Sequence, residues 1–266
     1  MAFVPDITIT SLETITAYSL TGDYRFTLDE LQKGTIANTQ DKQDITGKMG
    51  RKLSSIKKNK GVTVSGDNGM VSGGLMAAQV GNQFVEGATE VLFTDYLVVK
   101  GNKATTSYKA VGTAGNEIAT IYVRNDNGTI GKSYTQDATA KTGKFAYAPD
   151  TKEISFNTGE VADGTEIVVS YKRKVEAFVL ENAADHYSEK LMLYVDAMGE
   201  DKCGNVYRVQ FYLPKADFNG EFSLEMGDNQ TIHSFEAESL VGAGCAGVGS
   251  NLWTYTIFAN DAEDAQ

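Results

Sequence analysis

Apolar and polar residues alternate along residues 206–240, and this alternation predicts antiparallel strands. Side chains of a strand point to alternate faces, so every second residue of this stretch would share one buried face. Pro214 has no backbone N–H to donate and is expected to end the first strand. Asn219-Gly220 is a typical hairpin turn, and the alternation resumes after it. The pattern predicts a meander with one apolar face and one face that carries carboxylates.

The first third of the chain combines short strands with a long polar stretch. Residues 30–50 are polar and show little periodicity, so they are predicted to form a long loop, of a length that is usually functional or disordered. A short helix is predicted at residues 75–80, and it is expected to end at Gly81. Alternation predicts strands at residues 7–10, 14–20, 24–28 and 62–65.

Evenly spaced apolar runs separated by turns fill the middle of the chain, between residues 89 and 174. Such spacing predicts a small β-sandwich or barrel. Because no Cys-Trp-Cys framework is present, "immunoglobulin-like" is an analogy for this section. The expected strands are 91–99, 108–111, 118–123, 144–147, 154–157 and 167–171.

The segments after the middle section are predicted to be strands joined by polar connections. Residues 181–188 have room for one helical turn, and residues 196–205 are expected to form an acidic loop. Strands are expected at 191–195 and, last in the chain, at 253–259.

Negative charge is concentrated in the last third of the chain. The chain has a net charge of −11, and residues 177–266 contain 15 acidic and 4 basic side chains, so this third accounts for the whole excess. One interpretation is solubility. The other is a focused anionic face, which would repel nucleic acid, formed on the polar sides of adjoining strands by Glu221, Glu225, Glu236 and Glu238.

Basic residues cluster in one segment, which follows the polar stretch. No aromatic side chains alternate with these residues and no nucleic-acid fold signature is present, which argues against phosphate binding. A solvated face, or contact with the acidic third of another subunit, fits the segment better. The cluster consists of Lys48, Arg51, Lys52, Lys57, Lys58 and Lys60.

Motifs for catalysis, cofactors and metals are weak. Residues 242–247 match G-x-G-x-x-G, but a strand rather than a helix is expected after them, so we expect no dinucleotide cofactor. His186, Cys203, His233 and Cys245 lack metal-ligand spacing; His233 is expected to be a structural histidine, and the cysteines either pair or remain free thiols. We expect that the protein is not an enzyme and that it binds neither a cofactor nor a metal ion. Neither a signal-peptide pattern nor an apolar run of about 20 residues is seen, so no membrane association is expected.

Two stretches carry a resemblance to a known family. FYLPKADFNGEFSLEMGD at 211–228, followed by HSFEAESL at 233–240, resembles the C-terminal part of tail tube proteins, the major tail proteins of long-tailed bacterial viruses. The resemblance covers roughly the first 85 and the last 90 residues. It implies a mainly β fold, an antiparallel β-sandwich or barrel with a short flanking helix.

The resemblance also implies a function. In that family, rings of six subunits stack into a hollow tube that conducts viral DNA without binding it specifically, and a long early loop reaches the next ring. The basic cluster would then lie at the contact between rings, and the four glutamates would line the lumen. The implied location is the virion tail, with assembly in the host cytoplasm; the implied partners are the chain itself, a tape measure protein, a tail terminator and a baseplate or tip.

The domain interpretation follows from where the resemblance lies. Residues 1–88 and 175–266 would form the discontinuous tail-tube domain, and residues 89–174 an inserted immunoglobulin-like domain on the tube exterior. A single enlarged sandwich remains an alternative. The competing function is that of a capsid decoration or adhesin-type protein, which would bind a host-surface ligand through the middle section.

Overall fold

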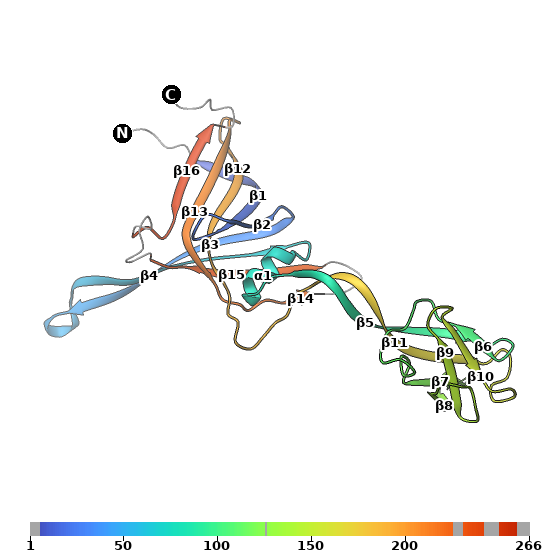
Figure 1. The fold of residues 1–266 in the computed structure, drawn as a ribbon. Helices are drawn as coiled ribbons and strands as arrows, with labels where there is room; N and C mark the ends of the chain where they lie inside the picture. The colour runs from blue at the N-terminus through green and yellow to red at the C-terminus, as the bar shows by residue number, and fades with distance from the viewer. Residues whose placement is uncertain (1–5, 126, 226–230, 242–249, 260–266) are drawn as a thin grey trace. The chain divides into compact units, whose positions relative to one another are not determined.

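The computed structural model describes residues 6–125, 127–225, 231–241 and 250–259. The fold is mainly antiparallel β-sheet, with one α-helix and one 3-10 turn among these residues (Figure 1). The chain divides into two compact units, which are described separately: unit 1 contains residues 1–84 and 180–266, and unit 2 contains residues 85–179.

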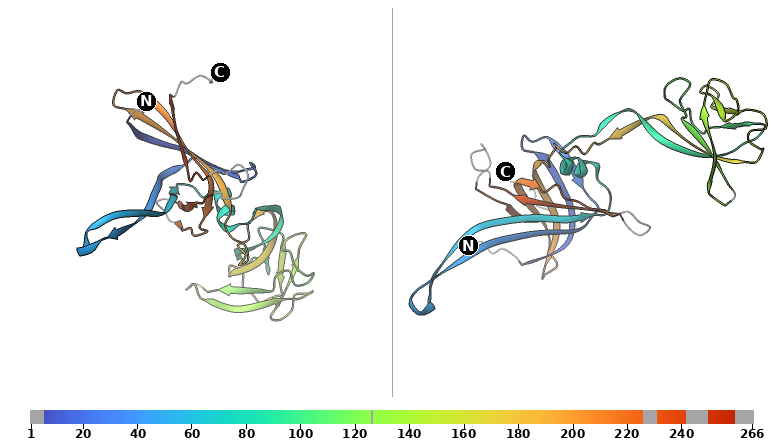
Figure 2. Two further views of the ribbon diagram at one scale, coloured as in Figure 1. Left: turned by 90° about the vertical axis from the view of Figure 1, so that its left-hand side faces the viewer. Right: turned by 90° about the horizontal axis from the view of Figure 1, so that it is seen from below.

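Unit 1 is built on one antiparallel sheet with the strand order β2-β1-β12-β13-β15-β4-β3. The sheet curls (Figure 2), and strand β1 comes close to β3 at the far end of the order. Strand β14 pairs with β15, and β16 pairs with β13. The strands are β1 Ile7–Ser19, β2 Tyr24–Leu28, β3 Leu31–Thr46, β4 Lys52–Asn68, β12 Lys190–Asp201, β13 Val206–Phe218, β14 Leu224–Glu225, β15 Ile232–Ser239 and β16 Thr254–Ala259.

One face of the curled sheet forms the core of unit 1, and helix α1, Gly73–Val80, packs against it. The helix begins because the Ser72 side chain caps the backbone N–H of Leu75, and it ends as predicted at Gly81, which adopts the left-handed conformation. A side chain at Gly81 would collide with the backbone of Tyr187 as well as strain φ, so glycine is required there. The core residues include Ile15, Phe26, Val64, Leu75, Leu193, Leu213, Phe218 and Phe235.

The predicted loop at 30–50 is wrong, because these residues form most of a long hairpin. Strands β3 and β4 pair antiparallel from Leu31 and Asn68 out to Thr46 and Lys52, and a 3-10 turn, η1 Lys48–Gly50, joins them. The outer part of the hairpin packs on no core, so both of its faces are exposed and the alternation that marks a half-buried strand is missing. The backbone N–H and C=O groups of each strand are instead hydrogen-bonded by the partner strand.

The predicted end of the strand at Pro214 is also wrong. Strand β13 continues to Phe218, and its register with β12 shifts between the pairs Leu191–Ala216 and Leu193–Leu213. Pro214 therefore lies in a bulge, one of the few positions where a sheet tolerates a residue without an N–H.

Asn219-Gly220 does not make a hairpin. Strands β13 and β14 lie on the same side of β15, since Phe218 pairs with Ala237 and Leu224 pairs with His233. Asn219-Gly220 consequently interrupts the pairing with β15, which β13 makes before it and β14 makes after it. It looks like a hairpin signal because the local turn chemistry is the same.

Three further boundaries differ from the predictions for unit 1. Strand β1 is one strand with two register shifts, where two short strands were predicted. Strand β12 extends through part of the predicted acidic loop to Asp201, and residues 181–188 contain no helical turn. Gaps in alternation at bulges, and acidic residues on an exposed strand face, account for the first two differences.

Unit 2 has its own sheet and its own core. The strand order is β5-β11-β7-β8-β9-β10-β6, antiparallel except for the β8–β9 pair. The strands are β5 Val85–Val98, β6 Lys103–Thr105, β7 Thr120–Arg124, β8 Ile130–Gln136, β9 Lys144–Ala148, β10 Glu153–Phe156 and β11 Glu166–Val179. Buried residues include Val99, Ile118, Ile121, Tyr134, Phe145, Ile154, Ile167 and Val169.

Two predictions for the middle section need correction. Residues 108–111 form no strand and only Val111 makes an isolated bridge, to Lys172. Strands β6 and β8 were not predicted, because β6 is three residues long and β8 buries only Tyr134. Neither presents the periodic apolar face from which strands are recognised.

A buried carboxylate ties β5 and β11 to the loop after β6. Asp95 is 6% exposed and accepts hydrogen bonds from the Ser107 backbone N–H at 2.8 Å and the Tyr171 hydroxyl at 2.7 Å. The Ser107 hydroxyl donates to its other oxygen at 2.7 Å. Burial, then the hydrogen bond to Asp95, raises the pKa of Tyr171 to about 12. Both side-chain oxygens of Asp95 are hydrogen-bonded, as buried polar atoms must be.

Candidate functional site and assembly surfaces

The outward face of the unit 1 sheet carries the glutamates that the sequence singled out. Along β15 the buried residues Phe235 and Ala237 alternate with the exposed residues Glu236 and Glu238. Glu238 lies opposite Asp217 of β13 and Thr63 of β4. These side chains therefore point away from the core, and Glu238 and Asp217 place two acids side by side on neighbouring strands, with Asp217 also 3.5 Å from Lys190 Nζ of β12.

A shallow groove of about 460 Å³ brings two of these glutamates together. Glu221 and Glu236 both line it, with Asp67 and Lys33 on its walls, and the Asn219 side chain amide donates to Glu236 Oε1 at 3.4 Å. Glu225 pairs with Ile232 of β15. Ile232 and Glu236 are four residues apart on this strand, so their side chains lie on the same face. All four predicted glutamates are exposed and belong to the same outward face of the sheet.

The same face continues across β13, β12, β1 and β2 as a row of tyrosines that the sequence analysis missed. Tyr212 stacks on Tyr194 at 4.7 Å between ring centroids, and Tyr18 makes edge contacts with Tyr194 and Tyr24. Burial raises the pKa of Tyr212. The tyrosine row could have been predicted from the tyrosines that occupy outward positions of several strands. The face thus combines acids, hydroxyls and amphipathic rings.

The predicted basic cluster lies at the outer end of the β3–β4 hairpin, which we call the arm (residues 39–61; Figure 1). Lys52 pairs with Asp44 at 2.7 Å within the arm, and Lys58 lies opposite Asp41 in the register. The cluster residues are exposed: Lys48, Arg51, Lys52, Lys57, Lys58 and Lys60.

Apolar side chains also reach solvent at the end of the arm. Met49 is 90% exposed and Leu53 is 70% exposed, and Ile45 and Ile56 are about half exposed. Met49 has φ 63°, a left-handed conformation that is uncommon for a residue with a side chain. Sequence reasoning took only the charges of this segment into account, although the apolar residues were visible. An exposed arm with a mixed basic and apolar tip contributes little to the core of its own subunit.

Helix α1 is attached to the sheet through a buried histidine. His233 is fully buried; its Nδ1 accepts from the Ser72 backbone N–H at 3.3 Å, and its Nε2 lies 2.8 Å from Gln79 Oε1. Gln79 in turn donates to the carbonyl of Ser234 at 3.0 Å. Burial lowers the pKa of His233, so the ring is held neutral. It has the structural role that the sequence predicted.

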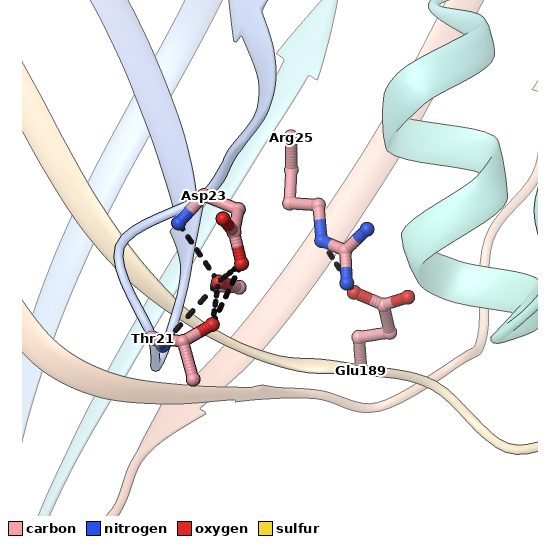
Figure 3. Close-up of polar contacts among 5 residues, drawn as sticks. Thr21, Asp23, Arg25 and Glu189 are labelled. Atoms are coloured by element: carbon pink, nitrogen blue, oxygen red, sulfur yellow. Dashed lines mark hydrogen bonds and ion pairs between the residues drawn. The ribbon is translucent and has the colours of Figure 1, made fainter.

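The β1–β2 turn is fixed by a compact polar cluster (Figure 3). Asp23 accepts hydrogen bonds from the hydroxyls of Thr21 at 2.7 Å and Ser19 at 3.0 Å, and these two bonds lower its pKa. Beside it, Arg25 Nε lies 3.2 Å from Glu189 Oε2, while the Glu189 backbone N–H donates to Ala78 of the helix. The cluster holds the edge strand β2 next to α1.

The other predicted chemical groups are dispersed. His186 and Cys203 are exposed and Cys203 is a free thiol, whereas Cys245 and the Gly-rich residues 242–247 lie outside the described residues. In the described ranges, no group of three or more His, Cys, Asp or Glu side chains is arranged to hold a metal ion. None of the helices there is long and apolar enough to cross a membrane.

These features define a mainly β protein whose notable surfaces are a polar sheet face and a projecting arm. The chain matches the model of the YomU/Tube protein family over residues 7–249 and therefore belongs to that family. This membership makes it a phage tail tube protein, a structural component of the virion tail, and implies assembly with itself and with other tail proteins. A search of curated proteins gave no match.

Proposed function

We propose that the subunit forms hexameric rings that stack into the hollow tail tube and conduct viral DNA. The arm is the observation that carries the proposal. It extends the β3–β4 pairing well beyond the core, exposes basic and apolar side chains together, and has no packing role in its own subunit. A second subunit supplies the surface that such an arm needs.

The edges of the unit 1 sheet support ring formation. Strands β2 and β3 end the strand order, and β3 is 16 residues long. An open edge of this length is a template for pairing with another chain. Closing such sheets side by side into a barrel removes the edges, which gives a physical reason for a ring.

The outward face of the sheet supports a role as the wall of the bore. DNA adheres to walls from which lysine and arginine neutralise its phosphates, and carboxylates avoid that contact. The four glutamates share this face with tyrosines and hydroxyl side chains. We assign Glu221, Glu225, Glu236 and Glu238 to the lumen, and the arm, with its cluster Lys48, Arg51, Lys52, Lys57, Lys58 and Lys60, to the contact with the next ring.

Unit 2 is proposed to decorate the tube exterior as an independently folded domain. Its separate core and its nearly balanced charge support this assignment: residues 86–176 contain 12 acidic and 11 basic side chains. Tape measure, terminator and baseplate or tip proteins would complete the tail, and no host-surface ligand is needed to explain unit 2.

Shortening the arm tests the proposal. Thr39 and Gly61 face each other in the register, so residues 40–60 can be replaced by a two-residue turn without disturbing the inner pairs. The variant is expected to keep the thermal stability of the full chain and to lose polymerisation, measured by electron microscopy. Normal tubes from the shortened chain would contradict the role of the arm, and loss of folding would show that the arm belongs to the core.

A further inference from the structure

An apolar cavity of about 380 Å³ opens beside the core of unit 1. Strands from both halves of the curled sheet line it: β1, β12 and β13 from one half, and β3 and β4 from the other. Its volume is in the range of cavities that bind ligands. Ile9 is 46% exposed there, and Leu12, Ile36 and Phe211 are half-buried. Lys33 is the charged side chain of the lining. The apolar lining of this cavity therefore reaches solvent.

The tip of the arm presents the kind of side chain that such a cavity accommodates. Met49 and Leu53 are the most exposed apolar residues of the arm, and Ile45 and Ile56 flank them. Apolar groups gathered on a projecting segment mark an interaction site. The chain therefore contains both a convex apolar tip and a concave apolar cavity.

The arm cannot reach the cavity of its own subunit. Ile36 lines the cavity, and Met49 follows it by 13 residues, which is roughly 40 Å of extended strand at about 3.3 Å per residue. Strands β3 and β4 are paired along this length, and the hairpin projects away from the curled sheet (Figure 2). A paired hairpin does not fold back on itself, so the tip is available only to another molecule.

Charge complementarity indicates that this other molecule is a second copy of the chain. The arm contains seven basic and two acidic side chains. The rest of unit 1 contains 21 acidic and six basic side chains. The arm is therefore attracted to unit 1 of any other copy, and opposite charges of this kind steer two surfaces into register.

Acidic groups also lie at the side of the cavity next to Ile9. Glu200 and Asp201, at the end of β12, pair with the first residues of β1. Asp6 lies at the same end and is paired with Lys202 at 3.4 Å. A basic arm tip that enters the cavity from this side would meet carboxylates at its rim.

We propose that the apolar cavity of unit 1 receives the tip of the arm from a second copy of the chain, with Met49 and Leu53 inserted against Ile9, Leu12 and Phe211. This inference rests on the proposed function, in which the arm contacts the next ring, and it identifies the surface that the arm contacts. Tip and cavity are different surfaces of one chain, so the contact is heterologous. Each bound subunit offers a further tip, and the contact can therefore propagate along an axis.

Cysteine cross-linking between two populations of full-length chains tests this docking. All chains carry Cys203→Ser and Cys245→Ser. Donor chains carry Leu53→Cys and a tag that changes their size, and acceptor chains carry Ile9→Cys. A short bismaleimide joins cysteines that lie close together, and a denaturing gel shows the product whether or not tubes form. In the matched control, Thr8→Cys replaces Ile9→Cys, because Thr8 is also exposed and lies on the opposite face of β1.

The head-to-tail contact predicts a specific pattern of products. The mixture of donor and acceptor chains should give a heterodimer, and either population alone should give little product. Chains that carry both Leu53→Cys and Ile9→Cys should give a ladder of oligomers. Acceptors with Thr8→Cys should lose most of the heterodimer. Equal reaction of Ile9→Cys and Thr8→Cys would overturn the proposal.

A second pair of variants separates insertion of the apolar tip from attraction by charge. Met49→Glu in the donor chains should remove most of the heterodimer. Ser54→Glu, which makes the same change in charge at an exposed polar residue of the arm, should retain most of it. Equal yields from these two variants would contradict insertion of the tip.

The cross-linking result and the tubes can fail separately. Tubes that form without a product between Leu53→Cys and Ile9→Cys would overturn this docking and leave the proposed function in place. The same product without tubes would support the docking and contradict the stacking of rings.

Discussion

Each unit contains a buried polar residue whose contribution to stability can be tested directly: His233 in unit 1 and Asp95 in unit 2. His233 is neutral in the folded chain, and burial holds its pKa below the usual value of 6.5. The unfolded chain therefore binds more protons below pH 6.5, so the contribution of His233 to stability is present above that pH and is lost as the pH falls towards the folded pKa. We expect the melting temperature to decrease between pH 7.5 and pH 5.5.

Substitution separates this histidine from other titrating groups. His233→Gln should reduce the loss of stability on acidification, while His186→Gln, at the other histidine, which is exposed, should leave it unchanged. The melting temperature of each variant is measured by circular dichroism as a function of pH. The same pH dependence in both variants would refute the assignment. Gln79→Met should destabilise the chain by about 1–3 kcal/mol, because the imidazole N–H loses its acceptor.

Asp95 provides the corresponding test in unit 2. Asp95→Asn places an amide N–H₂ where only acceptors fit the donors of Ser107 and Tyr171, so we expect a loss of about 1–3 kcal/mol. Asp163→Asn is the control: Asp163 is exposed and accepts a hydrogen bond from the Gly101 backbone N–H. Denaturant titration measures both. A similar small effect in the two variants would show that the buried network is not important for stability.

At the scale of secondary-structure elements, the charges of the arm can be tested without shortening it. Replacing Arg51, Lys57 and Lys58 by Glu should weaken polymerisation, and the defect should depend on salt, since exposed charges are screened over about 10 Å in 0.1 M salt. Reversing Lys52 alone would also break its ion pair with Asp44, so it is left unchanged. Unchanged tube yield in light scattering at low and high salt would show that the arm does not act through its charge.

The elements predicted correctly from the sequence are those whose residues meet both core and solvent. In strand β2, exposed and buried residues alternate, and helix α1 ends at a left-handed glycine, Gly81. Both features can be recognised from the local sequence. The arm could not be recognised, because its outer strands bury neither face and are held by pairing that no local pattern encodes. Likewise, the position of Pro214 in a bulge depends on the register of neighbouring strands.

The candidate site was predictable in part for the same reason. Glu236 and Glu238 are i and i+2 on a half-buried strand, so their common face follows from the sequence alone. The association of Glu236 with Glu221 across the groove depends on β13 and β14 sharing one side of β15, which the turn signal at Asn219-Gly220 obscured.

For the whole molecule, the acidic face can be tested by reversing its charge. Replacing Glu221, Glu225, Glu236 and Glu238 by Lys should leave tube formation largely intact, because all four side chains are exposed, and should slow DNA ejection from the assembled virion. Reversing four exposed acids of unit 2 provides a control with the same change in net charge. Normal ejection by the first variant would leave solubility as the reason for the charge asymmetry.

Removing unit 2 tests its independence from the tube. Val85 and Val179 are partners in the register, so Phe84 and Leu180 can be joined by a short Gly/Ser linker. We expect thinner tubes that are otherwise intact. Aggregation of the shortened chain would indicate that the strands of unit 2 belong to one enlarged sandwich.

Electron cryo-microscopy of the purified full-length chain tests the central claim most directly. The account predicts hollow tubes of stacked sixfold rings, with the face that carries Glu236 and Glu238 towards the bore and the arm reaching the adjacent ring. Discrete monomers or trimers that bind cells or glycans would contradict it, and tubes with that face outward would contradict the role given to the glutamates.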